Sequence, residues 1–243
     1  MLSRWLAFCE PKSDWDMAHC QDRWALRPLR QGVEAALSDG ATEACLSRLW
    51  AELLVEASTQ DLPFLEAWGR KAWLPRLHGL SKTWREAAEA VLPEPRSWVA
   101  TRALQRGSHA TLLQVTLVGR HWIARAVGDS CLLVIRAGQV QRSFPLDTAE
   151  AFNTSPDLMT TLEGLDRPRQ VRRARGQLAS GDWVFLATDA LACRLLGPEG
   201  PGGLLEALRD PAPGAGYRAW VLGERQASRM RDDDTTLLLF RQP

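Results

Sequence analysis

The sequence predicts an α+β fold in which helices and mostly antiparallel strands form separate layers. The first observation is the order of the elements: short strands open the chain, a long helical region follows, and strands return after residue 97. The second is a series of strand-like runs at residues 110–118, 121–127 and 131–136, joined by short turns that contain glycine. Because such turns join antiparallel strands, the pattern argues against a doubly wound parallel sheet.

The composition is that of an ordinary globular protein. Of the 243 residues, 45% are hydrophobic and 24% are charged, which is enough chain for one large core, so we expect a single domain over residues 1–243. The net charge of +1 and the absence of a long apolar run give no reason to expect nucleic-acid or membrane binding. The five cysteines form no CxxC pair, and the N-terminal apolar run is short for a signal peptide, so we expect a cytoplasmic protein with reduced thiols. We also expect a monomer.

In the first half of the chain, the strands and helices are predicted from apolar periodicity. Strands are expected at 3–9, 22–26 and 33–38, and helices at 41–57 and 62–92, the second helix interrupted around Pro75 and Gly79.

In the second half, residues 145–178 are polar and are predicted to be irregular, apart from a short helix near 158–162. The remaining expected elements are strands at 139–144, 183–187 and 235–240, and helices after residue 189, at 204–208 and at 216–227.

Asp189 directly follows the apolar strand expected at 183–187. A carboxylate at the end of a buried strand needs a partner, and a metal ion or a helix N-cap would serve. Taken alone, Asp189 favours the cap. However, Asp22, Asp39 and the run Asp232-Asp233-Asp234 also stand at strand edges, and no His or Cys with ligand spacing accompanies them. Oxygen ligands of this kind favour Mg²⁺ or Mn²⁺ over Zn²⁺.

Several short motifs follow one another in a specific order. They are Cys-Gln-Asp at 20–22, Ala-Leu-Ser-Asp-Gly-Ala at 36–41, Arg-Ala-Val-Gly-Asp-Ser at 125–130, Ala-Thr-Asp-Ala at 187–190 and Asp-Asp-Thr-Thr-Leu-Leu-Leu at 233–239. In this order the chain resembles the metal-dependent protein phosphatase 2C family of Ser/Thr phosphatases, in particular its compact bacterial branch. The resemblance implies a four-layer α-β-β-α sandwich of two antiparallel sheets, with metal ions bound at one end.

The same resemblance implies roles for individual residues. Asp39 would bridge two Mn²⁺ or Mg²⁺ ions, and Gly40 would offer its backbone carbonyl. Asp189 and Asp233 would complete the shell of one ion, and Asp22 would hold a metal-bound water. Asp22 and Asp39 would thus be catalytic, and the substrate would be phosphoserine or phosphothreonine on a phosphoprotein. The sequence leaves open whether the chain works alone or beside a cognate Ser/Thr kinase.

Two departures from the family pattern favour a different class of function. Ala190 replaces the usual Gly after Asp189, and an Arg that grips phosphate in some relatives has no clear match among residues 12–19. The alternative is therefore a catalytically weak or inactive pseudophosphatase that acts as a binding or regulatory module.

Other polar residues carry weaker signals. The register within 232–234 is ambiguous, and Asp233 is chosen because Thr236 and the apolar run then align with the family motif. Asp129 is interpreted as a hairpin turn residue. His19 is interpreted as a surface or core histidine in preference to a proton donor. The arginines within residues 167–175 are interpreted as a solvated charged loop.

Overall fold

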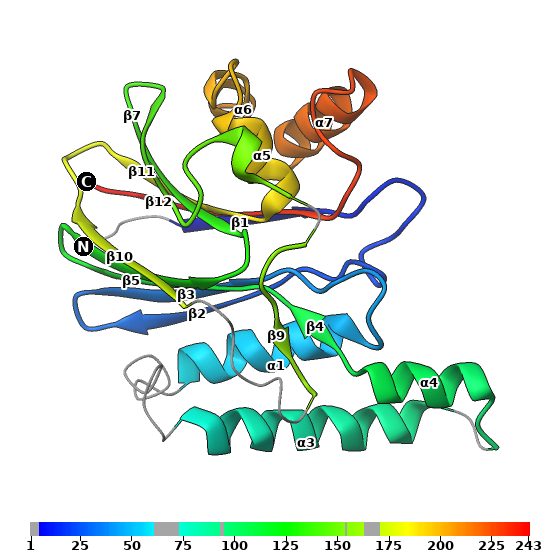
Figure 1. Ribbon diagram of the computed structural model, residues 1–243. Coiled ribbons are helices and arrows are strands. Elements are labelled where there is room, and N and C mark those ends of the chain that lie inside the picture. The colour runs from blue at the N-terminus through cyan, green and yellow to red at the C-terminus, as the bar shows by residue number, and fades with distance from the viewer. Residues whose placement is uncertain (1–4, 61–72, 93–94, 154, 163–170) are drawn as a thin grey trace.

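The computed structural model describes residues 5–60, 73–92, 95–153, 155–162 and 171–243. Two five-stranded antiparallel sheets face each other (Figure 1). The first sheet has the order β1 (Trp5–Glu10), β12 (Thr235–Arg241), β11 (Trp183–Ala187), β7 (Cys131–Arg136) and β8 (Gln139–Phe144). The second has the order β10 (Arg172–Gln177), β6 (His121–Val127), β5 (Leu112–Val118), β3 (Gly32–Ser38) and β2 (Arg23–Leu29). A small third sheet pairs β4 (His109–Ala110) with β9 (Met159–Thr160).

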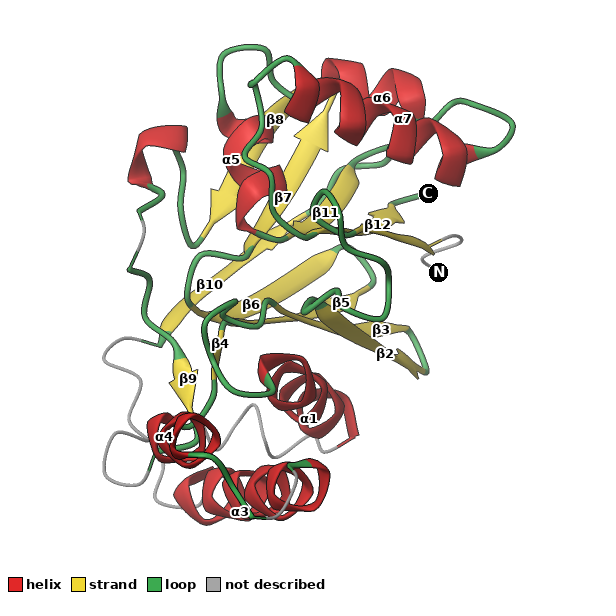
Figure 2. Ribbon diagram, turned by 90° about the vertical axis from the view of Figure 1, so that its right-hand side faces the viewer, coloured by secondary structure: helices red, strands yellow, loops and turns green. Residues whose placement is uncertain are grey.

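Helices cover the outer face of each sheet (Figures 1 and 2). On the second sheet lies α1 (Ser47–Gln60), and α3 (Trp73–Val91) packs against α1 farther from the sheet, together with α4 (Trp98–Arg106). On the first lie α5 (Asp189–Leu196), α6 (Gly202–Ala207) and α7 (Pro213–Gln226). The expected four-layer sandwich of helices, two antiparallel sheets and helices is confirmed. Among the described residues, no helix is long and apolar enough to cross a membrane.

The alternation of side chains along each strand explains why two sheets pack together. In β3, Val33, Ala35 and Leu37 point into the apolar core between the two sheets. Ala36 points the other way and packs in a second apolar cluster with Trp50 of α1. Because successive strand residues face opposite sides, a strand that is apolar on both faces must be covered on both. The same argument applies to the first sheet and its helices α5 to α7.

Several predicted elements differ from the structure for local reasons. The short helix expected near 158–162 is wrong, because Met159–Thr160 pairs with β4 as strand β9. Residues 145–178 are not irregular throughout, because β10 pairs with β6 at the sheet edge. An edge strand that exposes arginines on one side lacks the apolar run that marks a buried strand.

The helical region also differs in its boundaries. Helix α1 begins at Ser47 instead of residue 41, and the Ala41 N–H instead donates to the carbonyl of His109. Helix α4 was not expected, although the Ser97 side chain caps it by accepting from the Ala100 N–H. Helix α3 runs past Gly79 without interruption. The expected helical residues 62–72 lie outside the described part of the chain.

Candidate metal centre

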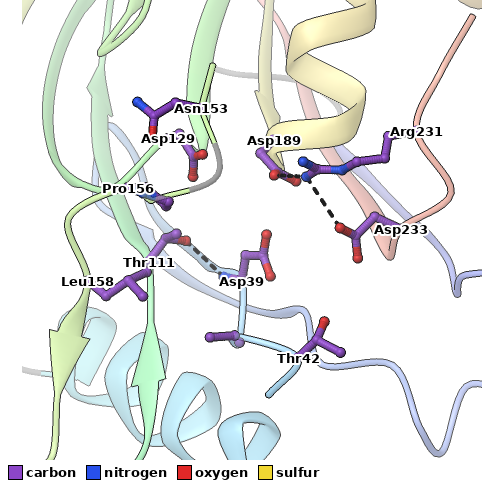
Figure 3. A pocket seen from close by; sticks show the side chains of 12 residues that line it. Asp39, Thr42, Thr111, Asp129, Asn153, Pro156, Leu158, Asp189, Arg231 and Asp233 are labelled. Carbon is purple, nitrogen blue, oxygen red and sulfur yellow. Dashed lines mark hydrogen bonds and ion pairs between the residues drawn. The ribbon is translucent and has the colours of Figure 1, made fainter. Parts of the chain in front are cut away.

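Carboxylates from both sheets meet at one end of the sandwich. Asp39 follows β3, Asp129 lies in the turn between β6 and β7, Asp189 begins α5 just after β11, and Asp233 precedes β12. All four line a cavity of about 320 Å³, shown from close by in Figure 3. Strands that are far apart in sequence therefore bring predicted site residues together at their ends. Asp129, predicted as a turn residue, lies in that turn and also lines the cavity.

Backbone hydrogen bonds hold Asp39 and Gly40 in place. The Asp39 N–H donates to the Thr111 hydroxyl at 3.0 Å (Figure 3). In return, the Thr111 N–H donates to the Asp39 carbonyl at 2.8 Å. Gly40 forms a β-bridge with Ala110. A Cβ atom at Gly40 would come within 2.9 Å of the Ser47 backbone, which explains why the smallest residue stands there.

The run at 232–234 sends its three carboxylates in different directions. Asp232 accepts from the Ser13 N–H at the surface. Asp234 is buried and accepts from the N–H groups of Lys12 and Gln21. Asp233 is the member of the run that lines the cavity. The chosen register therefore places the predicted ligand at the cavity, whereas its metal-binding role stays a prediction.

Asp22 is 3% exposed and is not among the described residues that line the cavity. Its Oδ2 accepts from the Thr188 hydroxyl at 3.1 Å, and its Oδ1 is buried without a hydrogen-bond partner in the described structure. Burial raises the pKa of Asp22 well above its ordinary value. Although it lies outside the cavity wall, its charge contributes to raising the pKa of Asp39.

Closely spaced carboxyl groups dominate the electrostatics of this end of the sandwich. Desolvation raises the pKa of Asp39 well above its ordinary value, and the charges of Asp22, Asp189, Asp233 and Asp129 raise it further. Burial and the charge of Asp189 raise the pKa of Asp129 to about 7. Carboxylates that repel one another in this way are stabilised by added positive charge.

One arginine supplies part of that positive charge. The Arg231 guanidinium forms an ion pair with Asp189 and lies 3.3 Å from Asp233 Oδ2, so it stands between the two carboxylates (Figure 3). Sequence reasoning did not single out Arg231, because an arginine in a polar loop carries no sign of the direction in which it points.

The donor set suits a hard divalent cation in its chemistry. All of its donor atoms are oxygens, which hard cations prefer. One of them, Asp22 Oδ1, is buried without a hydrogen-bond partner in the described structure. The Gly40 carbonyl belongs to the set as well, and a side chain at Gly40 would collide with Ser47. In the described part of the chain, however, no three His, Cys, Asp or Glu side chains are grouped as they stand so that they could hold a metal ion. Asp189 and Asp233 contact Arg231, and Asp22 contacts Thr188. Metal binding would therefore require these carboxylates to exchange their present partners.

The remaining predicted residues lie elsewhere. His19 is exposed and pairs with Asp16, Nδ1 lying 2.6 Å from Oδ1, as its surface interpretation predicts. Ala190 lines a neighbouring cavity of about 210 Å³ and not the carboxylate cavity. Arg172, Arg173 and Arg175 are on β10, so this part of the basic run is a strand and not a loop. Arg167 and Arg169 lie outside the described residues.

Asn153, Pro156 and Leu158 from the segment before β9 form one wall of the carboxylate cavity.

Comparisons with known proteins agree with this fold. The S. agalactiae serine/threonine phosphatase superposes with a TM-score of 0.64 at 14% identity, covering 99% of this chain and 100% of that chain. The Mycobacterium tuberculosis serine/threonine phosphatase PstP/Ppp gives 0.60 at 16% identity, with 99% of each chain covered. The catalytic domain of PstP in complex with two manganese ions gives 0.59 at 18% identity, covering 98% of this chain and 97% of that one.

At these identities, the structural similarity shows the fold alone. No curated protein matches the sequence. The model of the family described as protein phosphatase 2C matches residues 16–233, which is most of the chain. On this match, the chain belongs to the protein phosphatase 2C family.

Proposed function

We propose that this chain is a metal-dependent protein Ser/Thr phosphatase that hydrolyses phosphoserine or phosphothreonine with two Mn²⁺ or Mg²⁺ ions. The observation that carries the proposal is the convergence of Asp39, Asp129, Asp189 and Asp233 on one cavity at the ends of the two sheets. Family membership supports it, as does the relative crystallised with two manganese ions.

The proposed ligands are Asp39, the Gly40 carbonyl, Asp189, Asp233 and, through solvent, Asp22. Two divalent ions bound there would acidify a water molecule and neutralise the charge of the phosphoryl group during in-line displacement. Asp39 is positioned for this chemistry because Thr111 holds its backbone from both sides. Because the pKa values of Asp39 and Asp129 are raised, we expect these carboxyls to release protons as cations bind.

The cavity also bears on the class of substrate. With a volume of about 320 Å³, it lies at the small end of the range for ligand pockets, which suits a phosphorylated side chain presented by a larger molecule. The wall that contains Asn153, Pro156 and Leu158 would face such a substrate. On this interpretation the substrate is a phosphoprotein. A Ser/Thr kinase that phosphorylates the same substrate protein would be the counterpart of this phosphatase.

The alternative function is that of a pseudophosphatase that binds a partner without turnover. It is favoured by Arg231, which pairs with Asp189 and Asp233 where the proposal requires a cation. A fixed arginine there would supply the positive charge in place of a metal ion.

The deciding experiment measures hydrolysis of a small aryl phosphate and of phosphoserine, phosphothreonine and phosphotyrosine peptides. The purified chain is assayed with Mn²⁺, with Mg²⁺ and with chelator, beside Asp39→Asn. Asp232→Asn is the matched control, because this neighbour of Asp233 points to the Ser13 N–H outside the cavity.

The proposal expects turnover that needs the metal, that prefers phosphoserine and phosphothreonine, and that Asp39→Asn reduces to the level seen with chelator. Asp232→Asn should keep the wild-type rate. A well-folded wild-type chain without turnover under either metal would refute the enzyme and support the pseudophosphatase.

A further inference from the structure

Arg231 carries a positive charge on the wall of an otherwise acidic cavity. Among the described residues that line the 320 Å³ cavity, it is the basic one, beside Asp39, Asp129, Asp189 and Asp233. A phosphorylated substrate carries close to two negative charges, so these carboxylates would repel it without positive charge close by. The guanidinium is therefore chemically suited to the substrate as well as to its present carboxylate partners.

Solvent borders the side chain of Arg231 on one side. It is 52% exposed and belongs to the loop between α7 and β12, ahead of the strand. It lines both the 320 Å³ cavity and the adjoining 210 Å³ cavity. A rotation of this side chain can thus take the guanidinium away from Asp189 and Asp233 without moving the loop out of the cavity wall.

The ion pairs that hold Arg231 are of the kind that a divalent cation can displace. The guanidinium is 52% exposed, whereas the side chains of Asp189 and Asp233 are 12% and 30% exposed. Because solvent screens the charge of the exposed guanidinium, each ion pair contributes about 1 kcal/mol. A doubly charged ion held by the same two carboxylates gains more Coulomb energy than a singly charged guanidinium. If a metal ion takes Asp189 and Asp233, the guanidinium loses its partners and remains at the cavity.

We propose that Arg231 binds the substrate phosphate, and that Asp189 and Asp233 hold it in reserve until a divalent cation replaces it. This inference rests on the proposed function, because it requires the cation. In the cation-free protein, the arginine neutralises two carboxylates that would otherwise repel each other. In the loaded protein, its planar fork donates two hydrogen bonds to phosphoryl oxygens, a geometry that lysine does not reproduce.

The test compares the wild-type chain with Arg231→Gln and Arg231→Lys by titration calorimetry. The first titration adds Mn²⁺ to the metal-free protein, and the second adds inorganic phosphate to the Mn²⁺-loaded protein. For Arg231→Gln we expect Mn²⁺ to bind up to about fivefold more tightly, because its competitor is gone. We expect phosphate to bind at least about tenfold more weakly, because a charge-assisted hydrogen bond is lost. The phosphate affinity of Arg231→Lys should lie between that of the wild-type chain and that of Arg231→Gln.

Two other arginines serve as controls. Arg229 lies in the same loop but pairs with Glu224 and Glu199, so Arg229→Gln should leave both affinities at the wild-type value. Arg172 lines a third cavity next to Asp129 and donates to the Pro145 carbonyl. It is the rival phosphate ligand, so Arg172→Gln should not weaken phosphate binding. Urea denaturation of each variant confirms that the comparison is made on folded protein.

The outcomes distinguish a failure of the proposed function from a failure of the role of Arg231. A wild-type chain that binds no Mn²⁺ refutes the proposed function, and this inference falls with it. A wild-type chain that binds Mn²⁺, together with unchanged phosphate affinity in Arg231→Gln, overturns the role of Arg231 alone. Weaker Mn²⁺ binding in that variant, or loss of phosphate binding in Arg172→Gln instead, also overturns it.

Discussion

Asp129 allows a quantitative test of the electrostatics at the carboxylate cavity. It lies in the turn between β6 and β7 and is 5% exposed, and burial together with the charge of Asp189 raises its pKa to about 7. A buried carboxylate whose charged form is disfavoured destabilises the folded protein wherever it must ionise. We predict that Asp129→Asn, which removes this charge, stabilises the metal-free protein at neutral and higher pH.

The sign and size of the effect follow from the two pKa values. Below about pH 3.8, the carboxyl is protonated in both the folded and unfolded states, and no penalty arises. As the pH rises towards 7, the Asp129 carboxyl ionises in the unfolded chain before it ionises in the folded protein. The folded state therefore loses stability relative to the unfolded state. Above pH 7 the loss is complete, and one pKa unit corresponds to about 1.4 kcal/mol, so it amounts to about 4 kcal/mol. At pH 5, about 2 kcal/mol of it is present.

The assay is urea denaturation in the presence of chelator at pH 5 and pH 8, for the wild-type chain and Asp129→Asn. The variant should be more stable by about 2 kcal/mol at pH 5 and by about 4 kcal/mol at pH 8. Asp147→Asn, which removes an exposed carboxylate outside the cavity, should show no such difference. A stability difference that does not change with pH, or a variant less stable than the wild type at pH 8, would refute this account of the cavity.

Three further predictions concern two backbone positions at or beside the site and one ion pair within the second sheet. Gly40→Ala should lower the free energy of unfolding by about 1–3 kcal/mol and weaken Mn²⁺ binding, because its Cβ would lie 2.9 Å from the Ser47 backbone. Urea denaturation measures the first effect and titration calorimetry the second. Arg27→Ala should cost about 3–5 kcal/mol in urea denaturation, because it leaves the fully buried Glu34 without its ion-pair partner. Ala190→Gly should cost about 1 kcal/mol of stability in the first turn of α5 and leave Mn²⁺ affinity unchanged, because the methyl group faces the neighbouring cavity.

Each of these predictions has a clear contrary result. Gly79→Ala, where a Cβ atom meets nothing, is the control for Gly40→Ala, and equal behaviour of the two would show that Ser47 yields without cost. Restored stability in Arg27→Ala combined with Glu34→Leu would support the ion-pair argument, whereas a harmless Arg27→Ala would contradict it. Tighter Mn²⁺ binding in Ala190→Gly would mean that the methyl group does reach the proposed metal ligands.

The buried strands were predictable from sequence because they are apolar on both faces. The runs that became β7, β11 and β12 stand out for this reason. In β6, apolar residues instead alternate with exposed or half-buried ones, and the short turns between β5, β6 and β7 indicate antiparallel pairing. Strand β10 was not predictable, because it lies at a sheet edge and its exposed arginines give no apolar pattern. Strand β9 is two residues long and depends on β4 for its hydrogen bonds, so its sequence alone favours no structure.

The sequence by itself determined an α+β fold with antiparallel strands, because apolar periodicity and turn residues are local properties of the chain. Its motifs carry Asp22, Asp39, Asp189 and Asp233, and only their resemblance to a known family implied the sandwich layers. Only the tertiary structure decided which carboxylates face the cavity. It placed Asp233 there and turned Asp232 away. It also added Asp129 and Arg231, whose directions depend on contacts between segments far apart in the sequence. A charge in a turn or loop has no preferred side until the sheets pack, so its role is decided by packing.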